Sequence, residues 1–157
     1  MAIPDDLPRL VDLSQERMVV ISQSDPRFGS LVIGRDQWLA RIAESVGDAA
    51  YAVYVAEEGS ALIGYIAGRV VVFPDPPAVR YGIVDDIALD MHTYHGGLGR
   101  ELFATVRDWF SEQAIELVVI RVPRYHAVEQ AFWRSLGAVE WIEHTWKALP
   151  GFMWMTL

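Results

Sequence analysis

A glycine-rich loop in the second half of the sequence has the composition of an anion-binding turn. The segment from Leu89 to Arg100 reads LDMHTYHGGLGR and joins a predicted strand to a predicted helix. Gly96, Gly97 and Gly99 lack a Cβ atom, so backbone amides can point inward without steric clash. The N-terminus of the helix adds partial positive charge, and the loop therefore suits a pyrophosphate. A plain strand-to-helix turn is the alternative interpretation of the same glycines.

Two other nucleotide-binding motifs do not match this loop. A P-loop needs a Lys followed by Ser or Thr after its glycines, and this loop contains neither Lys-Ser nor Lys-Thr. A dinucleotide-binding fold has its glycine turn in the first strand–helix–strand unit, with an acid closing the second strand. Here the turn comes late in the chain, and the second strand ends in Val122 and Pro123.

Two adjacent acids, Asp85 and Asp86, interrupt the apolar strand that precedes the loop. Strict alternation along a strand places them on opposite faces, so they form no carboxylate pair unless a bulge intervenes. A carboxylate on an apolar face is costly unless it is paired or used. Asp85 is therefore either a functional base or a buried acid tied to an arginine or to backbone amides.

The remaining polar and aromatic candidates carry weaker patterns. The histidines (His92, His95, His126 and His144) lack metal-ligand spacing, so no metal site is expected. His126 and Tyr125 follow a predicted strand end, where a proton donor or a packed loop would both fit. Arg100 opens a helix, where a cation is unfavourable, so it either meets a phosphate or is solvated. The later tryptophans, Trp133 among them, are expected in the core or in pocket walls.

The elements that must position these residues alternate in a regular order. Helical periodicity predicts helices at Asp5–Ser22, Arg35–Val46, Leu98–Gln113 and Ala127–Leu136. Strand patterns cover Tyr51–Ala56, Ala61–Phe73, Tyr81–Leu89, Leu117–Val122, Val139–Trp146 and Phe152–Leu157. The fold class is α/β of the α+β type: a mixed, mostly antiparallel central sheet with helices on both faces.

The composition indicates one soluble domain spanning residues 1–157, with 52% apolar residues to form its core. The absence of cysteine excludes disulfides, thiol nucleophiles and Cys–zinc sites. A net charge of −8 argues against nonspecific nucleic-acid binding and favours cationic partners, although solubility alone would also explain it. The longest apolar run, residues 49–56, is too short to span a membrane, and no signal peptide is evident, so a cytoplasmic protein is expected.

The run from Tyr81 to Gly137 resembles the GNAT superfamily of N-acetyltransferases. The family motif Arg/Gln-x-x-Gly-x-Gly/Ala, between a strand and a helix, falls on Tyr94 to Gly99, and Leu89 stands where the family usually has Val. The later motif of Asn, Tyr and Gly falls on His126, Trp133 and Gly137. Within the superfamily the pattern is most similar to the diamine acetyltransferase branch.

The resemblance implies transfer of acetyl from acetyl-CoA to a primary amine by direct attack in a ternary complex. It places Asp85 at the position often proposed as general base. It implies that the cofactor contacts three positions of the strand, residues 94–100 of the loop and two positions near the last helix. These are Ile87, Ala88, Leu89, Tyr94, His95, Gly96, Gly97, Leu98, Gly99, Arg100, His126 and Trp133. A small, cationic amine is the expected acceptor, and a homodimer is compatible with the resemblance.

Several positions depart from the family pattern. Tyr94 replaces Arg/Gln, and His126 replaces Asn. Trp133 replaces the Tyr that protonates the leaving thiolate in many relatives, and an indole has no titratable proton near neutrality. The usual first strand has almost no room before Asp5. A catalytically weak acyl-CoA-binding or sensor module is therefore the alternative function. The segment Gln23–Gly34 and the turn near Pro150 are the expected walls of the acceptor site.

Overall fold

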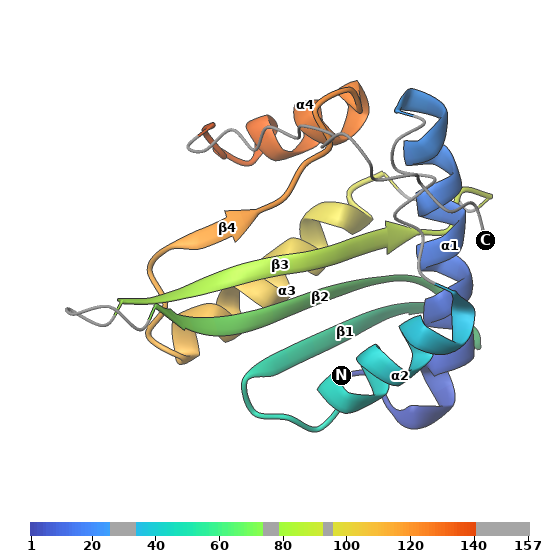
Figure 1. Ribbon diagram of the computed structural model, residues 1–157, viewed down its shortest axis with the longest axis horizontal. Helices are drawn as coiled ribbons and strands as arrows, with labels where there is room; N and C mark the ends of the chain where they lie inside the picture. The colour runs from blue at the N-terminus through green and yellow to red at the C-terminus, as the bar shows by residue number, and fades with distance from the viewer. Residues whose placement is uncertain (26–33, 74–78, 93–95, 141–157) are drawn as a thin grey trace, which may run out of the picture.

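A computed structural model describes residues 1–25, 34–73, 79–92 and 96–140 of the chain (Figure 1). A short 3-10 helix, Pro4–Asp6, precedes the elements labelled in the figure. The helices are α1 (Leu7–Ser24), α2 (Arg35–Ser45), α3 (Leu98–Glu112) and α4 (Ala127–Ser135). The strands are β1 (Tyr51–Glu58), β2 (Ala61–Phe73), β3 (Val79–Leu89) and β4 (Val118–Ile120).

Every element predicted before Leu136 is present, with bounds that differ by a few residues. β4 is shorter than the predicted Leu117–Val122, and its three residues are half-buried. Of the predicted strand Val139–Trp146, only Val139 and Glu140 are described, and they are not in a strand. The predicted strand Phe152–Leu157 lies outside the described residues.

The strands form one mixed sheet in the order β1-β2-β3-β4. β1, β2 and β3 pair antiparallel, whereas β3 and β4 are parallel because α3 carries the chain across the sheet between them. Helices α1 and α2 lie on one face of the sheet and α3 lies on the other, with α4 beyond the β4 edge (Figure 1). The predicted architecture is therefore confirmed.

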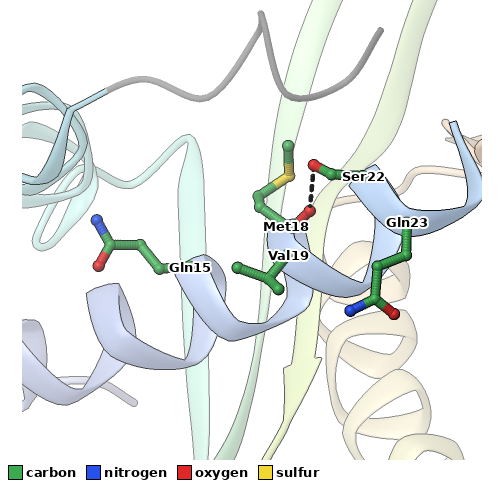
Figure 2. A pocket seen from close by; sticks show the side chains of 5 residues that line it. All are labelled: Gln15, Met18, Val19, Ser22 and Gln23. Atoms are coloured by element: carbon green, nitrogen blue, oxygen red, sulfur yellow. Dashed lines mark hydrogen bonds between the residues drawn. The ribbon is translucent and has the colours of Figure 1, made fainter. Parts of the chain in front are cut away.

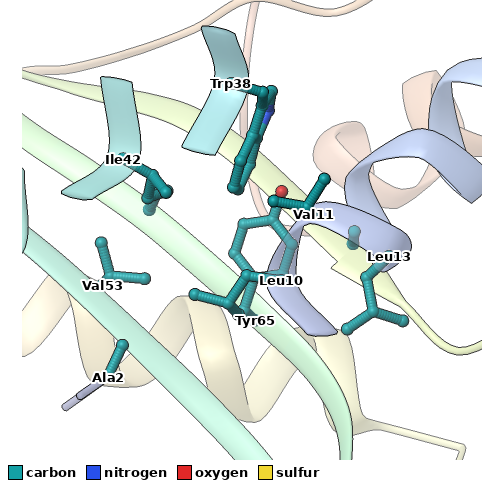
Figure 3. Close-up of a cluster of buried hydrophobic side chains, with 10 residues drawn as sticks. Ala2, Leu10, Val11, Leu13, Trp38, Ile42, Val53 and Tyr65 are labelled. Atoms are coloured by element: carbon teal, nitrogen blue, oxygen red, sulfur yellow. The ribbon is translucent and has the colours of Figure 1, made fainter. Parts of the chain in front are cut away.

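On the first face, α1 and α2 bury an apolar cluster against the sheet (Figure 3). α1 contributes Leu10, Val11 and Leu13, and these surround Tyr65 of β2, whose ring is fully buried. Trp38 of α2 meets the Tyr65 ring edge-on, with ring centroids 6.2 Å apart. This packing fixes α1 over β2 and β3, and the polar residues on the same helix face are held against the sheet with it.

On the second face, α3 approaches the sheet closely over glycines. A Cβ atom at Gly82 would lie 2.6 Å from the ring of Phe110, and one at Gly68 would lie 2.9 Å from Val106. The face of α3 that meets the sheet carries Leu102, Val106 and Phe110, all buried. The glycines let the helix sit at a distance from β2 and β3 that any larger residue would increase.

The N-terminus makes one backbone contact with the sheet. The N–H of Ala2 donates to the carbonyl of Val53 at the outer edge of β1, 2.7 Å away. Within the described residues no strand precedes Pro4, which starts the 3-10 helix. None of the described helices has the length and apolar character needed to cross a membrane.

Candidate active site

A β-bulge in β3 brings Asp85 and Asp86 to one face of the sheet. Ala67 of β2 pairs with Asp86, whereas the next residue, Gly68, pairs with Val84, so Asp85 is an extra residue in β3. Both acids contact residues on the α1 face of the sheet. The prediction that strict alternation separates them is therefore wrong, because the bulge shifts the alternation by one residue.

Asp85 is held between two arginines. Its carboxylate lies 2.7 Å from Nε of Arg69 on β2 and 3.1 Å from Nη2 of Arg121, which follows β4. The Asp85 side chain retains 19% of its exposure, and the Arg121 side chain is mostly exposed. The carboxylate is thus paired rather than isolated on an apolar surface, and it remains accessible from solvent.

Asp86 is held by the helix that covers it. It accepts hydrogen bonds from the hydroxyl of Tyr65 and from Oγ of Ser14, the latter at 3.2 Å. Nη1 of Arg17 lies 3.0 Å from its other oxygen. Burial raises the pKa of the Tyr65 hydroxyl well above its ordinary value, and the charge of Asp86 adds to the shift.

Arg17 also reaches α4. Its Nη2 lies 2.8 Å from Oε1 of Glu129, a carboxylate that is almost completely buried. Burial alone would lower the pKa of the Arg17 guanidinium, but the charges of Asp86 and Glu129 outweigh that effect and raise it. The second oxygen of Glu129 lies 3.4 Å from Nδ1 of His126. A polar chain therefore runs from β3 through α1 to the start of α4.

This row of polar contacts crosses a gap that opens between β3 and β4. The two strands pair only from Gly82–Val118 to Val84–Ile120, and β3 continues to Leu89 without β4 beside it. The gap begins where the bulge lies. Since the two strands diverge there, the last five residues of β3 have an edge that β4 does not cover.

The direction of the backbone groups along this edge follows from two hydrogen bonds. The N–H of Gly82 points toward β4, donating to Leu117, whereas the N–H of Asp90 donates to Ile63 on the β2 side. N–H directions alternate along a strand, so without the bulge the N–H groups of Gly82 and Asp90, an even number of residues apart, would face the same edge. Beyond the bulge, Ile87 and Leu89 therefore turn their N–H and C=O groups into the gap.

The glycine loop ends at the mouth of the gap. Gly97 caps α3 with φ of +103°, a left-handed conformation that favours glycine, and its carbonyl accepts from the N–H of Arg100 at 2.8 Å. The first amides of α3 are left without helical partners, as an anion site requires. Gly99 is buried, and a Cβ there would lie 3.2 Å from the ring of Phe132 on α4. Tyr94 and His95 lie outside the described residues.

Two further predicted cofactor residues have defined surroundings. Arg100 is exposed and donates to Oγ of Ser135 at 2.7 Å. Trp133 is 2% exposed and packs edge-on against Phe103 and Phe132, which confirms its predicted place in the core. Its indole N–H is buried without a hydrogen-bond partner in the described structure.

A separate hollow lies on the outer side of α1 and has a volume of about 550 Å³ (Figure 2). Among the described residues, its lining is Gln15, Met18, Val19, Ser22 and Gln23 of α1. Met18 at this hollow is half-buried, whereas Ile21 of the same helix is fully buried. Most of the predicted acceptor wall Gln23–Gly34, and the turn near Pro150, lie outside the described residues.

Among the residues with described positions, no cluster of three or more His, Asp and Glu side chains could hold a metal ion. The arrangement instead offers an uncovered strand edge, free helix amides and paired acids. Such a site suits an extended ligand that carries amide groups and an anionic end. The site thus defines a class of protein that binds a ligand of this chemistry, such as an acyl-CoA with its pantetheine amides and diphosphate.

The family comparison gives the same class. The model of the acetyltransferase (GNAT) family matches residues 16–138, and the chain belongs to that family. No curated protein matches the chain at a significant level.

Solved structures share the fold at low sequence identity. A Bacillus halodurans protein, solved as a tetramutant, has a TM-score of 0.81 at 17% identity and covers 94% of this chain and 97% of its own. A GCN5-related N-acetyltransferase from Ralstonia eutropha has a TM-score of 0.76 at 19% identity, covering 96% of each chain. An aminoglycoside 6′-N-acetyltransferase from Acinetobacter haemolyticus has a TM-score of 0.74 at 11% identity, covering 94% of each chain.

The sequence analysis did not identify Arg17 and Glu129, which join α1 to α4 across the gap. Arg17 lies in the buried stripe of α1, between Ser14 and Ile21, and a charged residue in such a stripe signals a buried partner. Glu129 lies one turn before Trp133 on the inward face of α4. The partner of each is on another element, so neither pairing has a local signal.

Proposed function

We propose that the protein transfers acetyl from acetyl-CoA to a primary amine by direct attack in a ternary complex. The observation that carries this proposal is the uncovered edge of β3, from Asp85 to Leu89, which leads directly to the glycine-capped start of α3. Membership of the family supports acetyl transfer from acetyl-CoA.

The described residues fit this cofactor. The N–H and C=O groups of Ile87 and Leu89 can pair with the amides of a pantetheine arm as a neighbouring strand would. The amides at the start of α3, beside Gly97, can hold the diphosphate. Bound acetyl-CoA would supply an acyl group activated as a thioester. The protein supplies orientation, which makes the reaction effectively unimolecular.

Asp85 is the proposed acceptor of the amine proton. An amine is protonated at neutral pH and must lose a proton before it attacks a thioester. Asp85 lies where the gap begins, and its carboxylate is partly exposed on the α1 face. Arg69 and Arg121 fix its direction, and a proton can reach it directly or through water.

The proposed acceptor is a small, cationic amine, as in the diamine acetyltransferase branch. The net charge of −8 supports this choice, since it attracts cations over long distances. Acetylation rates for a diamine should then fall as salt rises, because salt screens that attraction. A best acceptor that is neutral or anionic, with a rate independent of ionic strength, would contradict this proposal.

Two observations favour a second function, that of a weakly catalytic acyl-CoA-binding or sensor module. Asp85 is already engaged by two arginines, and Trp133 stands where a proton-donating Tyr is usual. Such a module would bind CoA without turnover.

One screen separates the two functions. Purified protein is incubated with acetyl-CoA and polyamines, other diamines, amino acids or peptides, and release of free CoA thiol is followed. Turnover with an amine supports the transferase. A CoA-dependent rise in melting temperature without turnover supports the binding module.

A further inference from the structure

We propose that His126 protonates the departing CoA thiolate, with Glu129 holding the imidazole in place. The inference rests on the proposed acetyl transfer. It assigns a catalytic role to a residue that the sequence analysis interpreted as either a proton donor or part of a packed loop.

The geometry around His126 is that of an oriented imidazole. Its Nδ1 is buried and faces Oε2 of Glu129 at 3.4 Å, with no closer hydrogen-bond partner. Such contacts are often long in an unliganded enzyme and shorten when substrate binds. The side chain keeps 17% of its exposure, and since Nδ1 is buried, that exposure belongs to its other atoms. Nε2, across the ring from Nδ1, is the nitrogen left for a substrate.

Glu129 is suited to orient a charged imidazole. A carboxylate this deeply buried must be paired, and Arg17 pairs it from the opposite wall of the gap. The carboxylate cannot turn away without losing Arg17, which is itself anchored on Asp86. The position of the His126 ring is thereby tied to β3, the strand that would carry the cofactor.

Trp133 stands where many members of the family have a proton-donating Tyr. Trp133 lies two helical turns after His126, and its indole N–H does not titrate near neutral pH. Imidazole changes charge between about pH 5 and 8, so it can deliver a proton and regain it at neutral pH. Among the described residues at the start of α4, His126 supplies an imidazole, which can both donate and accept a proton.

The proton balance of the step is complete. The amine nitrogen bonds to the thioester carbon, the C–S bond breaks, and its electron pair remains on sulfur. The proton on Nε2 of His126 moves to that sulfur, which yields the free thiol and a neutral imidazole. The proton lost by the amine goes to Asp85 or water, and His126 regains a proton from solvent.

His126 can be replaced without losing the start of α4. Its two structural hydrogen bonds are made by the backbone: its N–H donates to Pro123, and its carbonyl accepts from the N–H of Gln130. His126→Gln and His126→Asn should therefore fold. His92, which is exposed and also bonded through its backbone N–H, provides the matched control His92→Gln.

The test measures kcat, the affinity for acetyl-CoA and the pH dependence of the wild type and these variants. At about pH 6.5 we expect kcat of both His126 variants to fall about a hundredfold, the lower end of the range for general acids. Acetyl-CoA affinity should stay within about twofold. The deficit should shrink as the pH rises, because a general acid contributes only while it carries its proton. The charged groups facing the ring, Glu129 and Arg17, and Asp86 beyond them, are the same in all variants.

Three results would overturn the inference. The first is unchanged kcat in both His126 variants. The second is weaker acetyl-CoA binding at unchanged kcat, since His126 would then only hold the cofactor. The third is an equal deficit at every pH. If the wild type acetylates no amine, the proposed function itself fails, and no thiolate remains for His126 to protonate.

Discussion

Nη2 of Arg17 lies 2.8 Å and 3.1 Å from the two carboxylate oxygens of Glu129, across the gap where β3 and β4 diverge. The pair joins α1 to α4, two helices far apart in the sequence. Both side chains are largely buried, so each charge depends on the other for compensation.

Removing one member of this pair should destabilise the fold. Glu129→Gln or Arg17→Met leaves a buried charge with reduced compensation, which costs about 3 kcal/mol. For a domain of this size that corresponds to a fall in melting temperature of roughly 6–12 °C. The double variant Arg17→Met/Glu129→Gln should lose less than the sum of the single losses. Additive losses in thermal unfolding would show that the pair is not coupled.

Gly97 should be essential for binding CoA. Acetyl-CoA and CoA should raise the melting temperature of the wild type. Gly97→Glu should abolish that rise, because its side chain and negative charge would fill the diphosphate position. The control is Gly47→Glu, since Gly47 has a similar φ of +93° and open space around it. This control should lose comparable stability but keep the full CoA-dependent rise. A normal rise in folded Gly97→Glu would remove the loop from the site.

Replacing Asp85 should affect turnover more than stability. Asp85→Asn keeps the size of the side chain but removes the base, so kcat should fall about tenfold to a thousandfold, most severely at lower pH. Arg69 and Arg121 both retain access to water, so the fold should survive. Asp86→Asn should reduce kcat less while lowering the melting temperature, because Arg17 and Tyr65 depend on that carboxylate. Wild-type activity of Asp85→Asn at every pH would eliminate it as the base.

Trp133 should not act as a proton donor. Its N–H has no partner in the described structure, so Trp133→Phe removes no hydrogen bond and keeps an aromatic ring between Phe103 and Phe132. Most of the turnover should remain. A loss of a hundredfold or more in kcat, about 2.7 kcal/mol of barrier, with intact acetyl-CoA affinity would contradict this.

Tyr65 should make the fold sensitive to alkali. The pKa of its hydroxyl is raised well above the ordinary 10.0 by burial and by Asp86, so the folded state holds the proton more tightly than the unfolded state. This contribution is complete below that ordinary value and is lost as the pH rises through it toward the folded-state pKa. The free energy of unfolding, measured in denaturant from about pH 8 to 11, should fall above about pH 10. Tyr65→Phe should start less stable and show a flatter decline.

Local patterns in the sequence were sufficient to predict most of the elements. The β1–β2 hairpin, the start of α3 after Gly97 and the end of α4 before Gly137 all depend on residues within a few positions of each other. Gly97 and Gly137 adopt φ values of +103° and +88°, conformations that favour glycine. The glycine loop and the order of the elements therefore carried the resemblance to the family.

The arrangement of the charged residues was decided by the tertiary structure. Helices cover both faces of the sheet, so the residues around Asp85 are apolar on both faces. The pattern of apolar residues is therefore the same with or without a bulge, and the sequence could not reveal it. The bulge is visible only in the pairing with β2, which puts Asp86 opposite Ala67 and leaves Asp85 unpaired in the ladder. The sequence by itself determined the elements and the glycine loop, because those depend on neighbouring residues. The pairing of Arg17 with Asp86 and Glu129 required the packed helices, because only packing brings such distant residues into contact.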